Sequence, residues 1–192
     1  MFFRSTPWEA PVLWALDLET SGLSPKRGEI LSVGMVPIRA GTIRYGERYT
    51  SLVRPQAPER LSTAGIEAHH LLPAELAGAP PLSAVLPEID SRLREGVLLL
   101  HHAPLDVGFL RRAYRRLGLP WPRPRVVDTI DLLLALDHRR HRFTPHPEPP
   151  ATDLPGARRA LGLPPHDAHD ALADALATAE LFLALQARRH QG

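Results

Sequence analysis

A small set of acidic residues and one histidine could bind divalent metal ions and activate water. Its members are Asp17, Glu19, Asp106, His169 and Asp174. Each carboxylate interrupts an otherwise apolar segment, where an unpaired charge is costly to bury. Because this costly arrangement recurs three times along the chain, it indicates a shared purpose for the acids.

Asp17 and Glu19 are two residues apart in the segment Leu-Asp-Leu-Glu-Thr. In a strand, such residues point to the same face, so the two carboxylates would project together. Carboxylates held that close repel each other unless a proton or a cation lies between them, and Mg²⁺ or Mn²⁺ prefers such oxygen ligands. Acids also often end strands, but the following Thr20-Ser21-Gly22-Leu23 supplies a turn with hydroxyls and exposed backbone.

The other three residues are expected near helix N-termini. Asp106 follows an apolar strand and falls in the first turn of a helix, where a lone acid most often interacts with the helix dipole. His169 and Asp174 are five residues apart, about 140° around a regular helix, and could not share a site from mid-helix. We therefore expect His169 to precede a helix that Asp170 caps, with Asp174 in its first turn.

The apolar pattern predicts five strands that would position these residues. The first, Val12–Leu18, is a buried central strand that ends at the first acids. Ile30–Ile38 and Ile43–Val53 form an antiparallel pair through the turn at Ala40-Gly41-Thr42. Two further strands are expected at Val97–Leu100 and Val126–Asp128.

Helical spacing and stop signals predict helices between the later strands and after them. They are expected over Leu82–Leu93, around Phe109–Leu117, over Ile130–Leu136 and over Asp170–Arg188. The proline-rich residues 138–155 are expected to form a mobile surface loop. A role as a cover over a nucleic-acid groove is the alternative for this loop, and it depends on residues Arg139, Arg140, His141 and Arg142.

Composition indicates one domain over residues 12–190, preceded by an extension over residues 1–11. A chain of 192 residues that is 44% hydrophobic can bury one substantial core. Without cysteines it has no disulfide or thiolate site. The sequence starts without the apolar core of a signal peptide and has no apolar run of about 20 residues. We therefore expect a cytoplasmic protein without membrane contact.

Arginine dominates the positive charge, since Lys26 is the only lysine and the net charge is +2. Arginine binds phosphate in a bidentate manner, which favours a nucleic-acid partner, although a coding bias towards arginine explains the composition equally well. One basic group follows Asp106, and such a group more often forms a solvated helix face than a phosphate track. This group consists of Arg111, Arg112, Arg115 and Arg116.

Three motifs together resemble those of the DEDDh (DnaQ-like) exonuclease family. They are Asp-x-Glu-Thr-x-Gly-Leu from Asp17, His-x-Ala-x-x-Asp-x-x-Phe-Leu from His101, and His-x4-Asp from His169. The resemblance spans Val12 to about Leu185 and keeps the motifs in order. It implies an α/β, ribonuclease-H-like fold with a mixed five-stranded sheet flanked by helices.

The resemblance also implies 3′→5′ hydrolysis of a nucleic acid, with release of nucleoside monophosphates. Asp17, Glu19, Asp106 and Asp174 would hold two divalent ions, Mg²⁺ or Mn²⁺, about 3.5–4 Å apart. His169 would be the general base that takes the proton of the attacking water. The partners would be 3′ ends of single-stranded DNA or RNA, with DNA favoured.

Substrate contacts are implied for four positions. The Leu18 backbone and Thr20 would approach the sugar of the terminal nucleotide, and Ile66 would pack on its base unless it is a core residue. His102 replaces the asparagine that is common in relatives, which puts its contact with substrate or a ligating acid in doubt. Ala64 likewise replaces a histidine of the family, whereas Asp128-Thr129 matches a pair interpreted as structural.

Other functions remain open at this stage. A non-catalytic accessory module would bind a DNA polymerase or nucleic acid, but the presence of all four acids and the histidine favours an enzyme. An RNA-directed exonuclease of the oligoribonuclease or ribonuclease T type is a further alternative, because discrimination depends on contacts to the 2′-hydroxyl. A metal site built from histidines is disfavoured, since no compact ligand spacing recurs. The end of the sequence soon after its last helix favours a stand-alone enzyme or one borrowed by a larger assembly, and the oligomeric state is open.

Overall fold

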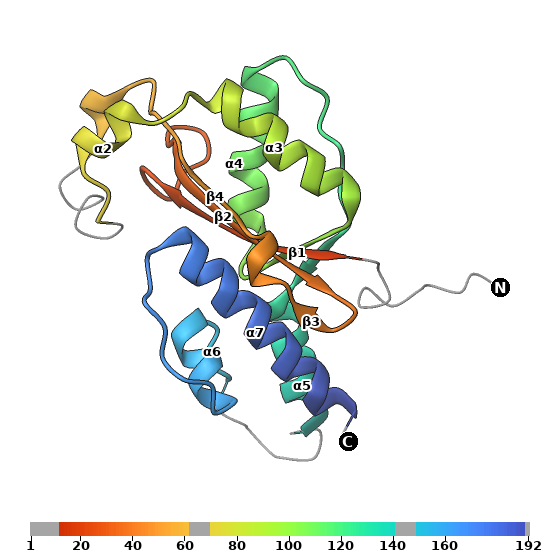
Figure 1. The fold of residues 1–192 in the computed structure, drawn as a ribbon. Helices are drawn as coiled ribbons and strands as arrows, with labels where there is room; N and C mark the ends of the chain where they lie inside the picture. Colours follow the sequence, from red (N-terminus) through yellow and green to blue (C-terminus); the bar gives the residue numbers. More distant parts are fainter. Residues whose placement is uncertain (1–11, 62–69, 141–148, 191–192) are drawn as a thin grey trace.

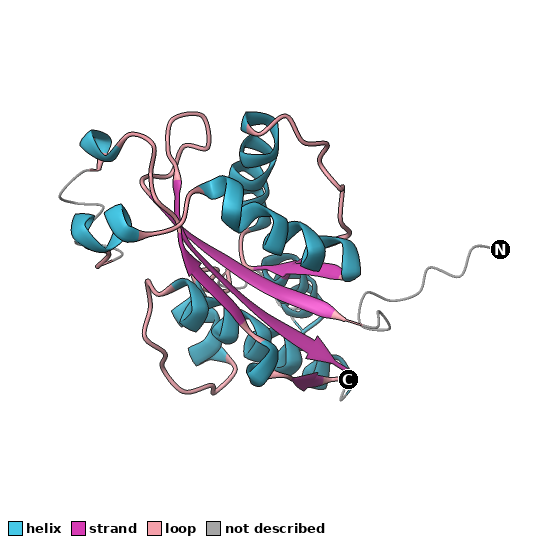
Figure 2. Ribbon diagram, turned by 45° about the horizontal axis from the view of Figure 1, so that its top comes forward, coloured by secondary structure: helices cyan, strands magenta, loops and turns pink. Residues whose placement is uncertain are grey.

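The computed structural model describes residues 12–61, 70–140 and 149–190. Its centre is a mixed sheet with the strand order β3-β2-β1-β5-β6, in which β4 also pairs with β2. Figure 2 shows this sheet between two layers of helices. The strands are β1 (Leu13–Thr20), β2 (Ile30–Arg39), β3 (Thr42–Ile43), β4 (Tyr49–Leu52), β5 (Val97–Leu100) and β6 (Val126–Asp128).

Strand β1 lies at the centre of the sheet and extends beyond its parallel neighbour. It pairs antiparallel with β2 along its whole length, but with β5 only over Leu13–Ala15. Strand β6 continues the sheet parallel to β5. The C-terminal half of β1, which carries Asp17 and Glu19, therefore projects past its pairing with β5.

Helices cover both faces of the sheet (Figure 1). Helices α3 and α4 lie over one face, and α5, α6 and α7 lie over the other. Short α2 lies before α3 in the chain. The helices are α2 (Pro73–Gly78), α3 (Leu82–Glu95), α4 (Ala103–Arg116), α5 (Thr129–Arg140), α6 (Leu154–Ala160) and α7 (Ala171–His190).

Alternation along β1 divides its side chains between the two apolar layers. Trp14, Leu16 and Leu18 pack with residues of α3 and α4. Leu13 and Ala15 belong to the cluster on the opposite face, which includes residues of α7. Because side chains two apart share a face, Asp17 and Glu19 continue the row that faces α7.

The predicted tight turn after β2 is confirmed. Ala40 and Gly41 both have positive φ angles, of 48° and 71°. Two successive residues with positive φ form the two-residue hairpin turn that matches strand twist. The turn reverses the chain so that β3 pairs antiparallel with β2.

The single strand predicted over Ile43–Val53 is wrong, since it is broken into β3 and β4 by a 3₁₀ turn at Tyr45–Glu47. The cause lies in Pro37 of β2. The Arg44 amide donates to the Pro37 carbonyl at 2.9 Å, but proline has no N–H to donate in return. The ladder stops there and resumes where Tyr49 faces Met35. The sheet thus has six strands in place of the five predicted, and its mixed character is confirmed.

The loop predicted over residues 138–155 is wrong at both ends. Helix α5 continues to Arg140, and α6 already begins at Leu154. Asp153 caps α6 by accepting the Gly156 amide at 2.8 Å, and Pro155 lies in the first turn, where its missing N–H is tolerated. Residues 141–148 lie outside the described part, as does the predicted extension 1–11.

None of the helices in the described residues is long and apolar enough to cross a membrane. Helix α7, the longest of the set, carries polar residues along its length and packs against β1 and β2.

Candidate active site

Three carboxylates from β1 and α7 meet at the end of the central strand. Ligand oxygens of Asp17, Glu19 and Asp174 all lie within 4.8 Å of one another. The prediction that Asp17 and Glu19 project together is confirmed by this geometry. Their partners across the ladder in β2 are Gly34 and Ser32.

Gly34 allows α7 to approach the sheet opposite Asp17. A Cβ atom at this position would overlap the carbonyl group of Ala171 and the amide of Leu172. The first turn of α7 therefore packs directly on the β2 backbone, and Asp174 in that turn comes beside Asp17 and Glu19. Gly34 was not singled out from the sequence, although a glycine inside a strand is the usual sign of a close backbone approach.

The start of α7 has the geometry expected from its sequence. The helix begins at Ala171, and Asp170 caps it by accepting the Ala173 amide at 2.8 Å. His169 precedes the helix with a φ angle of 70°. Its backbone amide donates to Oδ2 of Asp174 at 2.9 Å. The predictions of the cap and of the place of His169 are confirmed.

A second histidine contacts Asp174. Nε2 of His166 lies 2.7 Å from Oδ1 of Asp174, and both side chains are mostly buried. His169, in contrast, has an exposed side chain whose ring makes no hydrogen bond to the residues that the structure describes. Sequence reasoning gave His166 no role beside Asp174, because its spacing of eight residues carries no recognisable pattern.

Asp106 lies in the first turn of α4 and is buried, as expected for its position. It lies outside the group of three carboxylates, but its charge acts on Asp17. The nearby backbone of Asp106 itself and of Leu18 favours its ionised form and lowers its pKa in part.

Burial and mutual repulsion favour the protonated forms of these acids. Burial raises the pKa of Asp17 well above its usual value, and the charges of Asp106 and Asp174 add to the effect. Burial and the charges of Asp174 and Asp170 raise the pKa of Glu19 to about 7. The pKa of Asp106 is also raised, first by burial and then by the charges of Asp128 and Glu19. A cation among these oxygens would relieve the repulsion.

The donor set suits a hard divalent metal ion. All the donors are carboxylate oxygens, which Mg²⁺ and Mn²⁺ prefer over softer ligands. Within the described ranges, the acids of β1 and α7 are the one group of clustered side chains able to hold a metal ion. The disfavoured histidine site gains no support from His101, whose ring nitrogens lie 2.7 Å from Thr129 Oγ1 and 2.8 Å from the Thr152 carbonyl.

Asp128 has the structural role expected for it. Its carboxylate accepts the amides of His102, Ala103 and Ile130, at 3.1, 2.7 and 2.9 Å. These bonds satisfy backbone donors at the starts of both α4 and α5. Thr129 donates to the Leu100 carbonyl at the end of β5.

His102 occupies a left-handed backbone position just before α4, with a φ angle of 70°. Histidine and asparagine are both enriched in this conformation, so the replacement keeps the local backbone geometry. The side chain of His102 is exposed, and its contact with substrate stays a prediction. Thr20, at the end of β1, donates to the Gly22 carbonyl at 3.1 Å. Ile66 and Ala64 lie outside the described residues.

Comparison with known proteins agrees with this fold and site. A family model described as Exonuclease (RNase_T) matches residues 14–182. A DNA polymerase III PolC-type protein of Thermotoga maritima is 32% identical over 169 residues, covering 88% of this chain and 11% of that protein. A DNA polymerase III subunit epsilon-like protein of Rhodobacter capsulatus is 33% identical over 181 residues, covering 94% and 24%.

Among solved structures, an exonuclease I complex with single-stranded DNA from E. coli has a TM-score of 0.81 at 19% identity. The match covers 94% of this chain and 41% of that one. The likeness defines an α/β protein of the ribonuclease-H-like fold. Since the family model covers most of the chain, the chain belongs to the exonuclease family, in its DEDDh group. It spans a quarter or less of the length of the two relatives named above.

Proposed function

We propose that this chain is a metal-dependent 3′→5′ exonuclease that removes nucleoside monophosphates from single-stranded nucleic acid, with DNA favoured. The observation that carries the proposal is the meeting of Asp17, Glu19 and Asp174 within 4.8 Å. Asp106 is buried, and its charge raises the pKa of Asp17, which supports a place for this fourth acid beside the group. The names of the relatives, which are DNA polymerase III proteins, support DNA as the substrate.

Asp17, Glu19, Asp106 and Asp174 would hold two divalent ions, Mg²⁺ or Mn²⁺. Such ions lower the pKa of bound water and stabilise charge on phosphoryl oxygens. The repulsion that raises the pKa of Glu19 to about 7 is the physical reason for these four acids to take up cations. Asp174 is oriented for this role, since His166 and the His169 amide each contact one of its oxygens.

His169 would take the proton from the water that attacks the scissile phosphorus. The attack breaks the bond to the 3′ oxygen of the preceding nucleotide and leaves a monophosphate on the terminal one. His169 suits this task because its ring is exposed while its backbone is fixed to Asp174. Thr20 and the Leu18 backbone, at the same end of β1, would approach the terminal sugar, and Ile66 and His102 would make further contacts.

The experiment that tests the proposal uses 5′-labelled single-stranded DNA and RNA of equal sequence, with Mg²⁺, with Mn²⁺ and with EDTA. We expect a ladder that shortens from the 3′ end only when metal is present, and faster on DNA. Asp17→Asn and Asp174→Asn should each lower the rate at least about 100-fold, because both remove a ligand. Asp131→Asn, at an exposed acid of α5, is the matched control and should keep the rate.

Undiminished turnover in either ligand variant would contradict the assignment of the site. Faster cleavage of RNA would favour the oligoribonuclease or ribonuclease T type of activity. No cleavage by a folded sample under any condition would favour an accessory module that binds a DNA polymerase or nucleic acid. The polymerase III names of the relatives make a polymerase the first partner to test in that case.

A further inference from the structure

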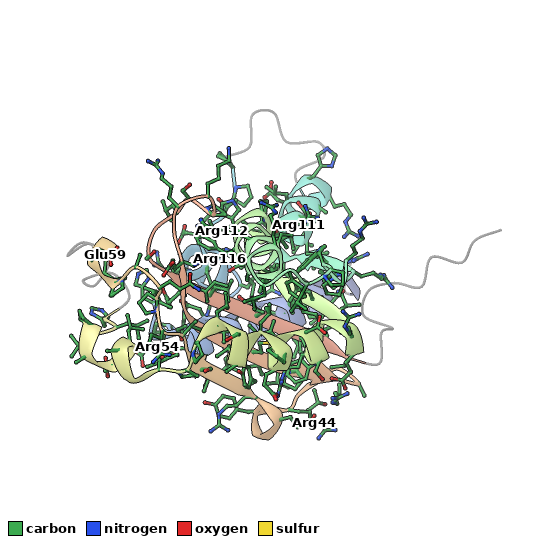
Figure 3. The ribbon with its side chains drawn as sticks, turned by 90° about the horizontal axis from the view of Figure 1, so that it is seen from above. Arg44, Arg54, Glu59, Arg111, Arg112 and Arg116 are labelled. Atoms are coloured by element: carbon green, nitrogen blue, oxygen red, sulfur yellow. The ribbon has the colours of Figure 1, made fainter. Side chains whose placement is uncertain are left out.

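The exposed face of α4 presents a row of arginines beside two adjoining hollows. Figure 3 shows Arg111, Arg112 and Arg116 gathered along this helix. A hollow of about 630 Å³ lies between the helix and the Pro25-Lys26 loop, and it is lined by all four arginines of the helix. Arg111 and Arg115 also line a second hollow, of about 610 Å³, together with Trp121 and Arg123.

The positive charge in these hollows is balanced only in part. Neither lining contains a carboxylate. Arg116 pairs with Glu29 at 3.1 Å, and Arg112 donates to the Pro25 carbonyl at 2.6 Å. Arg111 and Arg115 have no carboxylate partner in the described part of the chain, so they are available to an anionic ligand. Guanidinium groups bind phosphate through paired hydrogen bonds, which makes a phosphate chain the matching partner.

An aromatic ring stands among these arginines. Trp121 packs edge-on against Tyr114, with ring centroids 5.1 Å apart. The Arg111 guanidinium lies 5.9 Å from the Trp121 ring centroid. Sites for single-stranded nucleic acid combine arginines with aromatic rings, because the arginines bind phosphates and the bases stack on the rings. This pairing favours nucleic acid over an acidic protein surface as the ligand.

Helix α4 carries both a site acid and the arginines of the hollows. Asp106 is in its first turn, and a rise of about 1.5 Å and a turn of about 100° per residue place Arg111 and Arg115 roughly 7 and 14 Å further along the axis and about 140° and 180° around it. Gly108 lies against the loop that follows β1, since a Cβ there would approach Pro25 Cγ to 2.8 Å. A strand whose end reaches the acids would therefore pass this loop before it meets Arg111 and Arg115 on the outer side of α4.

We propose that Arg111 and Arg115 bind backbone phosphates of the nucleic-acid strand whose 3′ end enters the acidic site. The proposal rests on the proposed function, and it extends it from the terminal nucleotide to the nucleotides before it. It departs from the solvated helix face that the sequence favours for these arginines. Lys26 and Arg123, at the borders of the two hollows, lengthen the positive surface.

The test compares binding of a fluorescently labelled 20-nucleotide oligothymidylate by wild type, R111Q/R115Q and R44Q/R54Q, in EDTA. Figure 3 places Arg44 and Arg54 away from the α4 arginines, so the second variant loses equal charge elsewhere. We expect R111Q/R115Q to bind about tenfold more weakly. The slope of log affinity against log salt should fall by about 1.4, since each lost phosphate contact contributes roughly 0.7. R44Q/R54Q should keep both the affinity and the slope.

Equal affinity and slope for R111Q/R115Q and wild type would overturn the proposal, and would leave the face for an acidic protein partner. If R111Q/R115Q unfolds more readily than wild type, R115Q alone serves, with an expected slope change of about 0.7. Because the assay contains no metal, it separates the two proposals. Arginine-dependent binding without cleavage in metal would refute the exonuclease activity and keep the track.

Discussion

Asp174 is held by two histidines that contact it in different ways. The His166 ring contacts one carboxylate oxygen, and the His169 backbone amide contacts the other. We expect His169→Ala to lower the turnover number by about 10²–10⁴ at neutral pH, because the general base is lost. His166→Ala should lower it less and should raise the metal concentration needed for half-maximal rate. Turnover measured against pH and against Mn²⁺ concentration separates the two effects.

The pH profile gives the stronger test of the base. In His169→Ala, the rate should recover in part as pH rises and hydroxide replaces the missing base. His166→Ala should keep the shape of the wild-type profile. A flat and undiminished profile for His169→Ala would remove this residue from the base role.

We expect Asp106 to lower the stability of the metal-free protein at neutral pH. Its pKa is raised in the folded state, so ionisation costs more folded than unfolded, and the cost grows as pH rises above about 4. Asp106→Asn should therefore raise the melting temperature in EDTA at pH 8 by about 3 °C or more, and the gain should vanish near pH 4. Asp131→Asn should show no comparable gain. Equal melting temperatures for wild type and Asp106→Asn at pH 8 would contradict the unfavourable ionisation.

At the scale of elements, the contact between β2 and α7 sets the position of Asp174. Gly34→Ala would force the start of α7 away from β2, because its methyl group would overlap the Ala171 backbone. We expect a folded but destabilised protein that loses at least about 100-fold in activity, since the ligand acids separate. Gly46→Ala, where nothing lies within 4 Å, is the matched control. Wild-type activity in Gly34→Ala would show that Asp174 does not depend on this contact.

Elements with strong local signals were predictable from the sequence. Strand β1 follows from an apolar run that ends in acids, and the start of α7 follows from the cap at Asp170. The break between β3 and β4 was not predicted, because it depends on which neighbouring strand faces the missing N–H of Pro37. In the structure that side of Pro37 faces Arg44. Helix α6 was not predicted, because Asp153, Pro155 and the prolines before them are typical of a loop.

The acids of the site were predictable from the sequence, but the contacts that position them were not. Spacing put Asp17 and Glu19 on one face and Asp174 in a first turn, as the structure has them. The contact of His166 with Asp174 depends on how the segment before α7 folds back, which local pattern does not encode. The distance between β2 and α7 depends on tertiary packing, although Gly34 marks the place.

At the scale of the molecule, metal binding and folding are expected to be coupled. Bound Mg²⁺ or Mn²⁺ should raise the melting temperature by about 5 °C at pH 8 when it is well above its dissociation constant. Ligand carboxyls must be deprotonated, and the pKa of Glu19 is about 7. The stabilisation should therefore shrink as pH falls below 7. Thermal unfolding with MnCl₂, with EDTA and with NaCl of equal ionic strength measures it, and a metal effect unchanged at pH 5.5 would contradict it.

One carboxylate, that of Asp128, holds the first turns of two helices on opposite faces of the sheet. It accepts amides that begin α4 and an amide that begins α5, and α4 carries Asp106 and the arginine row. The helix layers on the two faces of the sheet are therefore both hydrogen-bonded to the same residue at the end of β6. A movement of the start of α4 would therefore break these hydrogen bonds or move the start of α5 with it, and α5 lies in the layer that contains α7.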